Sequence, residues 1–193
     1  MKARPPRRVE LLQRTRLLDD FFKLDAVQYR AERYAGTLGA PTRRLVLERG
    51  DSAAALLVSG DGGRVWLIEQ FRIATQASGP GWLLEVAAGV VADGETPEAC
   101  IRREVLEETG FEIARLEAIG DFYLSPGGAS ERVHLFIAEV GARRLPGGGD
   151  AAEGEDIRLI EFGRDELRAL WRAGGLHDAK TLIAVMHFLG VRP

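Results

Sequence analysis

The sequence predicts an α+β fold in which strands lie on both sides of one central helix and two more helices close the chain. Three observations carry this prediction. Strand-like runs are bounded by glycine and proline, residues 96–110 carry the start and stop signals of a helix, and two segments after residue 163 have helical spacing. Because the strands and helices occur in separate runs, we expect the layers of an α+β domain.

Before the central helix, strand-like runs follow one another with short turns between them. The expected strands are two within 9–34 that join near Asp19-Asp20, followed by 42–49, 52–59, 64–71 and 82–88. The turn Gly60-Asp61-Gly62-Gly63 joins two of these strands as a hairpin.

The central helix has clear end signals. Thr96 is the expected N-cap, Pro97 the first helical residue and Gly110 the left-handed C-terminal cap. Within the helix Glu104, Glu107 and Glu108 share one face, where like charges repel unless a cation lies against them. Their repulsion would be compensated either by a divalent cation such as Mg²⁺ or by ion pairs with arginines on a solvated face.

Two strands and two helices are expected after the central helix, with one more short strand between them. The strands at 111–125 and 131–140 surround the break Ser125-Pro126-Gly127-Gly128, and a short strand follows at 157–162. Helical spacing predicts helices at 164–174 and 178–190, both of which end at glycines.

Composition restricts the class of protein. With 193 residues, 46% hydrophobic and 28% charged, the chain suits one domain with a small N-terminal addition. No apolar run could span a bilayer, and a net charge of −3 gives no reason to expect duplex nucleic acid. The only cysteine, Cys100, is expected to be a small buried residue. The basic start MKARPPRR lacks a secretory signal, so we expect a disordered tail and a cytoplasmic protein.

A fixed pattern of charges and glycines runs through GVVADGETPEACIRREVLEETGF, residues 89–111. Gly89 and Glu95 precede the helix, Arg103-Glu104 and Glu107-Glu108 lie within it, and Gly110 ends it. A solvated face does not require the flanking glycines or the isolated Glu95. The pattern resembles the complete box of the Nudix hydrolases, which cut a nucleoside diphosphate linked to another group at its pyrophosphate. This resemblance sharpens the predicted fold to the Nudix α/β/α sandwich.

The resemblance implies a role for each matching residue of the box. Glu104 and Glu108 would bind the metal together with the backbone carbonyl of Ala88, with Mg²⁺ expected and Mn²⁺ as the alternative. Glu107 would lie nearby as a catalytic residue, and Arg103 would orient the glutamates. Glu95 is left as a cap, an indirect metal contact or a direct ligand.

Two further carboxylates follow the loop ARRLPGGGDAA. By resemblance Glu153 is the general base and Glu155 an additional metal ligand, and the glycines of the loop could let it close over bound substrate. The alternative is a polar loop that merely precedes a strand.

The wider resemblance covers about residues 9–190. SPGGASE (125–131) and EGEDIR (153–158) are similar to segments of bacterial ADP-ribose pyrophosphatases and GDP-mannose hydrolases. In that branch the N-terminal strands form a β domain exchanged across a homodimer. The resemblance thus assigns 1–48 to this domain and 49–193 to the hydrolase domain, with a second copy as the partner.

Substrate-binding residues are also implied by resemblance. Arg72 would hold a phosphate in two-point contact, the alternative being a strand-edge ion pair with Glu69 or Glu85. The other candidates are Phe22, which would stack the base, Arg43 or Arg44 from the other subunit, and Ser125 and Glu131 near the terminal ribose. An aromatic residue on a strand is also typical of a core.

The function implied is Mg²⁺-dependent hydrolysis of the small molecule ADP-ribose to AMP and ribose 5-phosphate. The first alternative is another nucleoside diphosphate sugar, above all GDP-mannose. A regulatory module that binds ADP-ribose without cutting it is a third hypothesis. Loss of a box carboxylate would favour that module, and none is lost.

Overall fold

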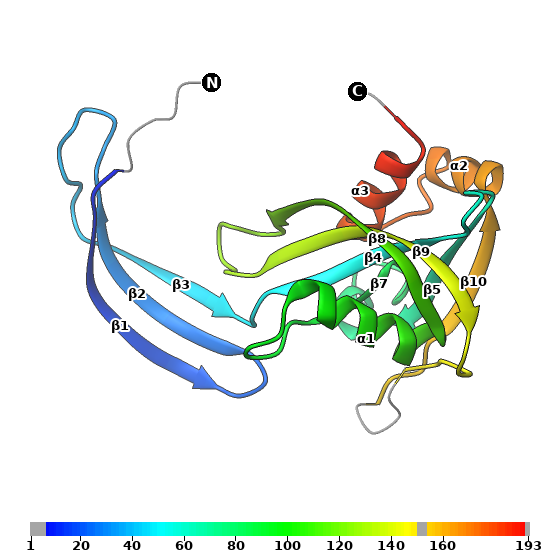
Figure 1. The fold of residues 1–193 in the computed structure, drawn as a ribbon. Coiled ribbons are helices and arrows are strands. Elements are labelled where there is room, and N and C mark those ends of the chain that lie inside the picture. Colours follow the sequence, from blue (N-terminus) through cyan, green and yellow to red (C-terminus); the bar gives the residue numbers. More distant parts are fainter. Residues whose placement is uncertain (1–6, 150–153, 192–193) are drawn as a thin grey trace. The chain divides into compact units, whose positions relative to one another are not determined.

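The computed structural model describes residues 7–149 and 154–191, which divide into two compact units. One unit contains the residues up to Gly50 together with Tyr123–Glu131, and the other contains Asp51–Phe122 and the residues from Arg132 onward. Figure 1 shows the elements of both units. The boundary expected after residue 48 stays a prediction.

The first unit is a three-stranded antiparallel sheet in the order β1 (Val9–Asp19), β2 (Lys23–Ala31) and β3 (Thr42–Glu48). The loop that includes Gly128 joins it, because the amide of Leu47 donates to the carbonyl of Gly128 at 2.8 Å. Among the described residues of this unit, the only buried side chains are the carboxylates Asp25 and Glu131. The sheet therefore has no apolar core within its described residues.

Asp25 lies in the middle of that sheet and is held by two arginines of β1. Arg14 Nε donates to its Oδ2 at 2.6 Å, and Arg16 Nε donates to its Oδ1. The hydrogen bond from Arg16 is the main cause that lowers the pKa of Asp25 below its usual value. The carboxylate thus stays charged although it is buried.

The second unit is built on a seven-stranded mixed sheet, the centre of which is β4 (Ser52–Val58). The path of the sheet is β10 (Arg158–Gly163), β5 (Arg64–Phe71), β4, β9 (Arg132–Arg143) and β8 (Phe111–Tyr123). β4 and β9 are parallel, and the pairings of β5 with β4 and with β10 are antiparallel. Every residue of β4 is buried.

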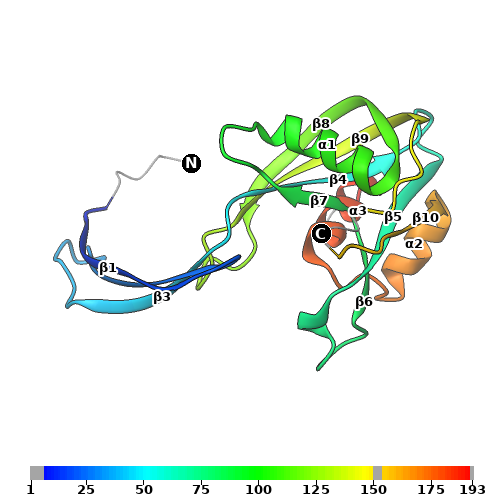
Figure 2. The same ribbon diagram turned by 90° about the horizontal axis from the view of Figure 1, so that it is seen from below.

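Helices cover both faces of this sheet, as Figure 2 shows. Ala53, Ala55 and Leu57 of β4 pack toward α1 (Pro97–Thr109), in a cluster with Cys100, Ile101 and Val105. The alternate residues Ala54, Leu56 and Val58 join the cluster of α2 (Arg164–Arg172) and α3 (Ala179–Phe188). The period-two alternation of one buried strand thus supplies both cores, and the α+β fold with its α/β/α layers is confirmed.

The segment expected as one strand at 82–88 is split in the structure. β6 (Trp82–Glu85) pairs with β5, whereas β7 (Ala87–Val90) pairs with β4. The break falls at Val86, whose amide donates to the hydroxyl of Thr181 at 2.8 Å instead of to a strand. A short 3-10 turn, η1 (Ile73–Thr75), was not expected from the sequence.

The ends of α1 are those that the sequence predicts. Thr96 Oγ1 accepts from the amide of Ala99 at 3.2 Å, and Pro97 is the first helical residue. Gly110 ends the helix with φ of +75°, and a Cβ at this position would overlap the carbonyl oxygen of Leu145. Gly110 is therefore required both by its backbone conformation and by the close approach of the next loop.

We expect Gly110→Ala to lower the free energy of unfolding by about 1 to 3 kcal/mol, because it adds left-handed strain and a steric overlap. Gly94→Ala is the matched control, since Gly94 has φ of +80° but no neighbour within 4 Å of an added Cβ. Urea unfolding of both variants measures the difference. Equal losses in the two variants would show that the packing against Leu145 contributes nothing.

Candidate active site

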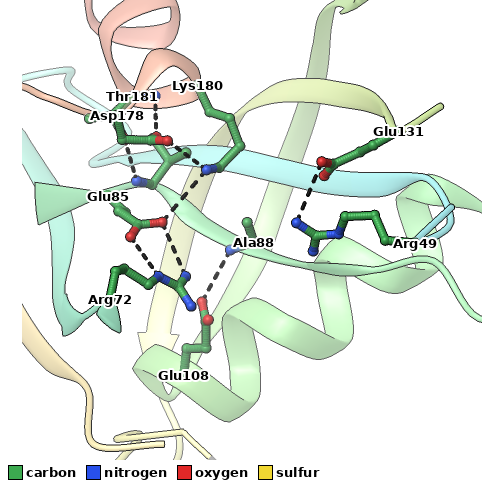
Figure 3. A network of polar contacts seen from close by, with 10 residues as sticks. Arg49, Arg72, Glu85, Ala88, Glu108, Glu131, Asp178, Lys180 and Thr181 are labelled. Atoms are coloured by element: carbon green, nitrogen blue, oxygen red, sulfur yellow. Dashed lines mark hydrogen bonds and ion pairs between the residues drawn. The ribbon is translucent and has the colours of Figure 1, made fainter. Parts of the chain in front are cut away.

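The carboxylates of α1 lie against the backbone of β7. Glu108 is only 2% exposed, and its Oε2 accepts from the amide of Ala88 at 3.2 Å (Figure 3). A Cβ at Gly89 would overlap the carboxylate of Glu104. The glycine of the motif thus allows the helix to bring Glu104 into contact with the strand.

Arg103 connects the glutamates of the motif to one another. Its Nη1 donates to Glu104 at 2.7 Å and to Glu107 at 3.2 Å, and its Nη2 donates to Glu95 at 3.3 Å. Glu95 Oε2 also accepts from the amide of Ala92 at 3.1 Å. Arg103 is therefore placed to orient Glu104, and Glu95 is placed to hold Arg103.

Burial makes the charged forms of Glu104 and Glu108 costly. Burial is the main cause that raises the pKa of Glu108 well above its usual value, and the charges of Glu104 and Glu155 raise it further. Burial also raises the pKa of Glu104, against the opposing effect of Arg103. Such a group of carboxylates favours the approach of a cation.

The oxygen donors fit a hard divalent ion such as Mg²⁺ or Mn²⁺. Glu104 and Glu108 are one helical turn apart, and Glu155 is close enough for its charge to act on both. No cluster of three or more histidine, cysteine or acidic side chains in residues 7–149 and 154–191 already has the arrangement of a metal site. Arg103 forms an ion pair with Glu104 and so balances part of the negative charge that a metal ion would otherwise balance.

The loop that leads to Glu155 forms backbone hydrogen bonds with the end of α1. The amide of Gly148 donates to the carbonyl of Glu108 at 2.7 Å, and the amide of Ile157 donates to the carbonyl of Gly148 at 3.1 Å. A Cβ at Gly147 would lie 2.6 Å from the backbone of Thr109. The glycines, interpreted from the sequence as a source of mobility, thus have a packing role. Glu153 lies outside the described residues.

Arg72 forms the ion pair with Glu85 that was one of the alternatives for it. Its Nε and Nη2 donate to the two oxygens of Glu85 at 2.7 and 3.1 Å, whereas Glu69 pairs with Arg158. Burial is the largest single effect and opposes the charge of Arg72, but the contact with Glu85 and the charges of Glu108 and Asp178 together raise the pKa of Arg72. Figure 3 shows this guanidinium near Glu108, whose charge also raises that pKa.

Lys180 and Asp178, which lie next to the pair of Arg72 with Glu85, were not identified from the sequence. Lys180 Nζ lies 3.6 Å from Glu85 and 2.7 Å from Asp178, and all three side chains are largely buried. The available signal was that Glu85 is the one charged residue in the apolar run WLLEVAAG.

The remaining candidates belong to the first unit. Phe22 is 41% exposed, with the guanidinium of Arg49 5.9 Å from its ring, and the neighbouring Phe21 is more open at 79%. Arg43 lines a hollow on one face of the sheet with Gln13, Thr15, Leu17, Ala26 and Gln28.

Arg44 follows Arg43 on β3. Because successive side chains of a strand point to opposite faces, the two arginines lie on opposite faces of the sheet, and Arg44 is exposed. Glu131 is buried and pairs with Arg49 at 3.4 Å (Figure 3). The side chain of Ser125 is exposed, and its carbonyl accepts from the amides of Gly128 and Ala129. Phe21 was not singled out from the sequence, although it adjoins Phe22.

Cys100 is fully buried, as expected, and burial raises its pKa to about 12. Its thiol is therefore protonated at neutral pH and packs as a small apolar group. None of the helices in the described part of the chain is long and apolar enough to cross a membrane.

Comparison with known proteins identifies the family. The model of the NUDIX domain matches residues 48–180. The chain belongs to the Nudix family. Its glycine-flanked helix with Arg103, Glu104 and Glu108 is thus the Nudix box.

Three relatives that share nearly the whole length of this Nudix chain have the same name. GDP-mannose pyrophosphatase of Cronobacter sakazakii is 38% identical over 93% of the chain and 94% of its own length. The protein of that name from Citrobacter koseri is 36% identical over 91% and 92%, and that from Escherichia coli is 35% identical over 91% and 92%. These names favour the alternative substrate of the sequence analysis over ADP-ribose, which was placed first.

We expect Glu104→Gln and Glu108→Gln each to remove most metal-dependent hydrolysis while the fold stays intact, because each replaces a buried charge by an isosteric amide. Without metal, the variants should be as stable as the unchanged protein or slightly more so, since like-charge repulsion is relieved. Turnover at limiting Mg²⁺ and thermal unfolding with a chelator measure the two effects. Near-normal turnover in both variants would contradict the metal site.

Proposed function

We propose that this chain is a Mg²⁺-dependent pyrophosphohydrolase of nucleoside diphosphate sugars, with GDP-mannose as the first candidate substrate. The observation that carries the proposal is the pair of carboxylates on α1, the buried Glu108 and the partly buried Glu104, beside the backbone of β7 at Gly89. Glu104 and Glu108 contact or approach that backbone, and Arg72 supplies a cation nearby. Carboxylates for a metal and a cation for phosphate are the parts that hydrolysis of a diphosphate needs.

In the proposed mechanism, Glu104, Glu108, Glu155 and the carbonyl of Ala88 would hold Mg²⁺. The metal would polarise the phosphoryl oxygens and make a water easier to deprotonate. Arg103 keeps Glu104 and Glu107 oriented through the hydrogen bonds described above. Arg72 binds a phosphate of the substrate, and Glu153 accepts the proton of the attacking water.

The choice of GDP-mannose rests on the relatives. Three proteins that share at least 91% of the length of this chain are named GDP-mannose pyrophosphatase. Cleavage of the pyrophosphate of GDP-mannose would release GMP and mannose 1-phosphate. Phe22 would stack the base, Arg43 or Arg44 of the second copy would contact it, and Ser125 and Glu131 would meet the sugar.

A panel of nucleoside diphosphate sugars tests this proposal. GDP-mannose should give the highest kcat/KM, and ADP-ribose serves as the direct competitor. Omission of Mg²⁺ should abolish release of both products. A preference for ADP-ribose would return the substrate to the first expectation, and metal-dependent binding without any turnover would support the regulatory module instead.

We also propose that the first unit is completed by a second copy of the chain. A unit whose only buried side chains, in its described part, are Asp25 and Glu131 buries little apolar surface by itself. Val9, Leu11, Leu17 and Leu18 of β1 are all at least half exposed. A homodimer would cover such residues, as the resemblance to the dimer-exchanged branch implies.

Removal of residues 1–48 should therefore give aggregation or loss of activity. Light scattering of the full chain and of the truncated chain measures the oligomeric state. A truncated protein that is monomeric and fully active would contradict the dimer.

The two carboxylates after the loop should have separable effects. Glu153→Gln should lower kcat by about 10² or more with little change in substrate affinity, because a general base acts mainly in the transition state. Glu155→Gln should instead raise the Mg²⁺ concentration needed for half-maximal rate. An unchanged kcat in Glu153→Gln would place the general base elsewhere.

A further inference from the structure

Glu85 is an acidic residue that neither the metal nor the hydrolysis explains. It ends β6, where its neighbours are apolar, and it is 3% exposed. Both of its carboxylate oxygens accept hydrogen bonds from Arg72 (Figure 3). A buried ion pair is weak evidence for stability, because removing two charges from water offsets their attraction. Such a pair is better explained by the geometry that it imposes.

The N-terminal end of α3 holds Glu85 through contacts with its side chain and with the adjacent backbone. Asp178 caps the helix, because its Oδ2 accepts from the amide of Thr181 at 2.9 Å and from the hydroxyl of Thr181 at 2.7 Å. The same hydroxyl accepts from the amide of Val86, so the backbone beside Glu85 is tied to the helix. Lys180, held by Asp178 at 2.7 Å, gives Glu85 a second cation at 3.6 Å.

Arg72 has N–H groups left to donate to a ligand, although it is paired with Glu85. A guanidinium has five N–H donors in a fixed plane, and the contact with Glu85 uses Nε and one N–H of Nη2. The backbone is also fixed, because the amide of Arg72 donates to the carbonyl of Gly81 at 2.7 Å. Three N–H groups thus remain on a guanidinium whose orientation is already set.

We propose that Glu85 is a positioning residue that orients the guanidinium of Arg72 for the phosphates of the substrate, with Lys180 as a second cation beside Glu85. The proposal rests on the proposed function, in which Arg72 binds a phosphate. A guanidinium oriented before binding loses less conformational freedom when the substrate arrives. Glu85 then acts on substrate affinity through Arg72 alone.

The test is a double-mutant cycle on hydrolysis of GDP-mannose. Glu85→Gln keeps the shape of the side chain and removes its charge, so KM should rise about tenfold while kcat changes little. Arg72→Gln should raise KM at least as much. The double variant should be no worse than Arg72→Gln, because Glu85 has no partner left to orient.

Glu69→Gln is the matched control, since it breaks the pair of a carboxylate on the neighbouring strand β5 with Arg158 and should leave KM unchanged. Thermal unfolding of all variants identifies a loss of fold. An unchanged KM in Glu85→Gln, or losses that add in the double variant, would overturn the proposal.

A second measurement separates this proposal from the proposed function. The NMR signal of the Arg72 Nε–H, assigned by its loss in Arg72→Gln, should be protected from exchange in the unchanged protein and exposed in Glu85→Gln. No turnover of any sugar nucleotide, with the signal protected by Glu85, would sink the proposed function and leave the orientation of Arg72 intact. An equally protected signal in Glu85→Gln would refute the orienting contact itself.

Discussion

The site depends on the close approach of α1 to the backbone of β7. Gly89 lets the carboxylate of Glu104 reach the strand, and Glu108 is buried with the amide of Ala88 as its donor. Burial alone would disfavour both charges, which is why their pKa values are raised. The energy that the apolar contacts of Cys100, Ile101 and Val105 provide on the same helix holds this arrangement in place. The proposed metal-binding face is thus built by packing that would be unfavourable for the charges by themselves.

The sequence predicts the parts of this site that depend on local rules. Thr96 and Gly110 mark the helix ends because capping and left-handed backbone are properties of single residues. The shared face of Glu104, Glu107 and Glu108 follows from the helical period alone. The fold class follows in the same way, from strand runs and from the residues at their turns.

Other parts depend on segments that meet only in three dimensions, and the sequence does not predict them. The sequence allows Glu85 as one of two partners for Arg72, and the structure has that pair, but no local pattern indicates the contact of Glu85 with Lys180 of the last helix. The break at Val86 depends on the hydroxyl of Thr181, which is 95 residues away. The motifs of the sequence do not distinguish ADP-ribose from GDP-mannose, and the proposal of GDP-mannose rests on the names of the relatives.

The split between β6 and β7 has a geometric consequence. Glu85, which holds the guanidinium of Arg72, and Ala88, which contacts the buried Glu108, are separated by two residues of one continuous chain. Three residue steps span at most about 10 Å, so covalent geometry sets an upper limit to the distance between the two anchor points. The length of chain between Glu85 and Ala88 therefore limits how far apart Arg72 and Glu108, which they contact, can lie. Insertions should therefore be tolerated far better in the surface turns of this fold than between residues 85 and 88.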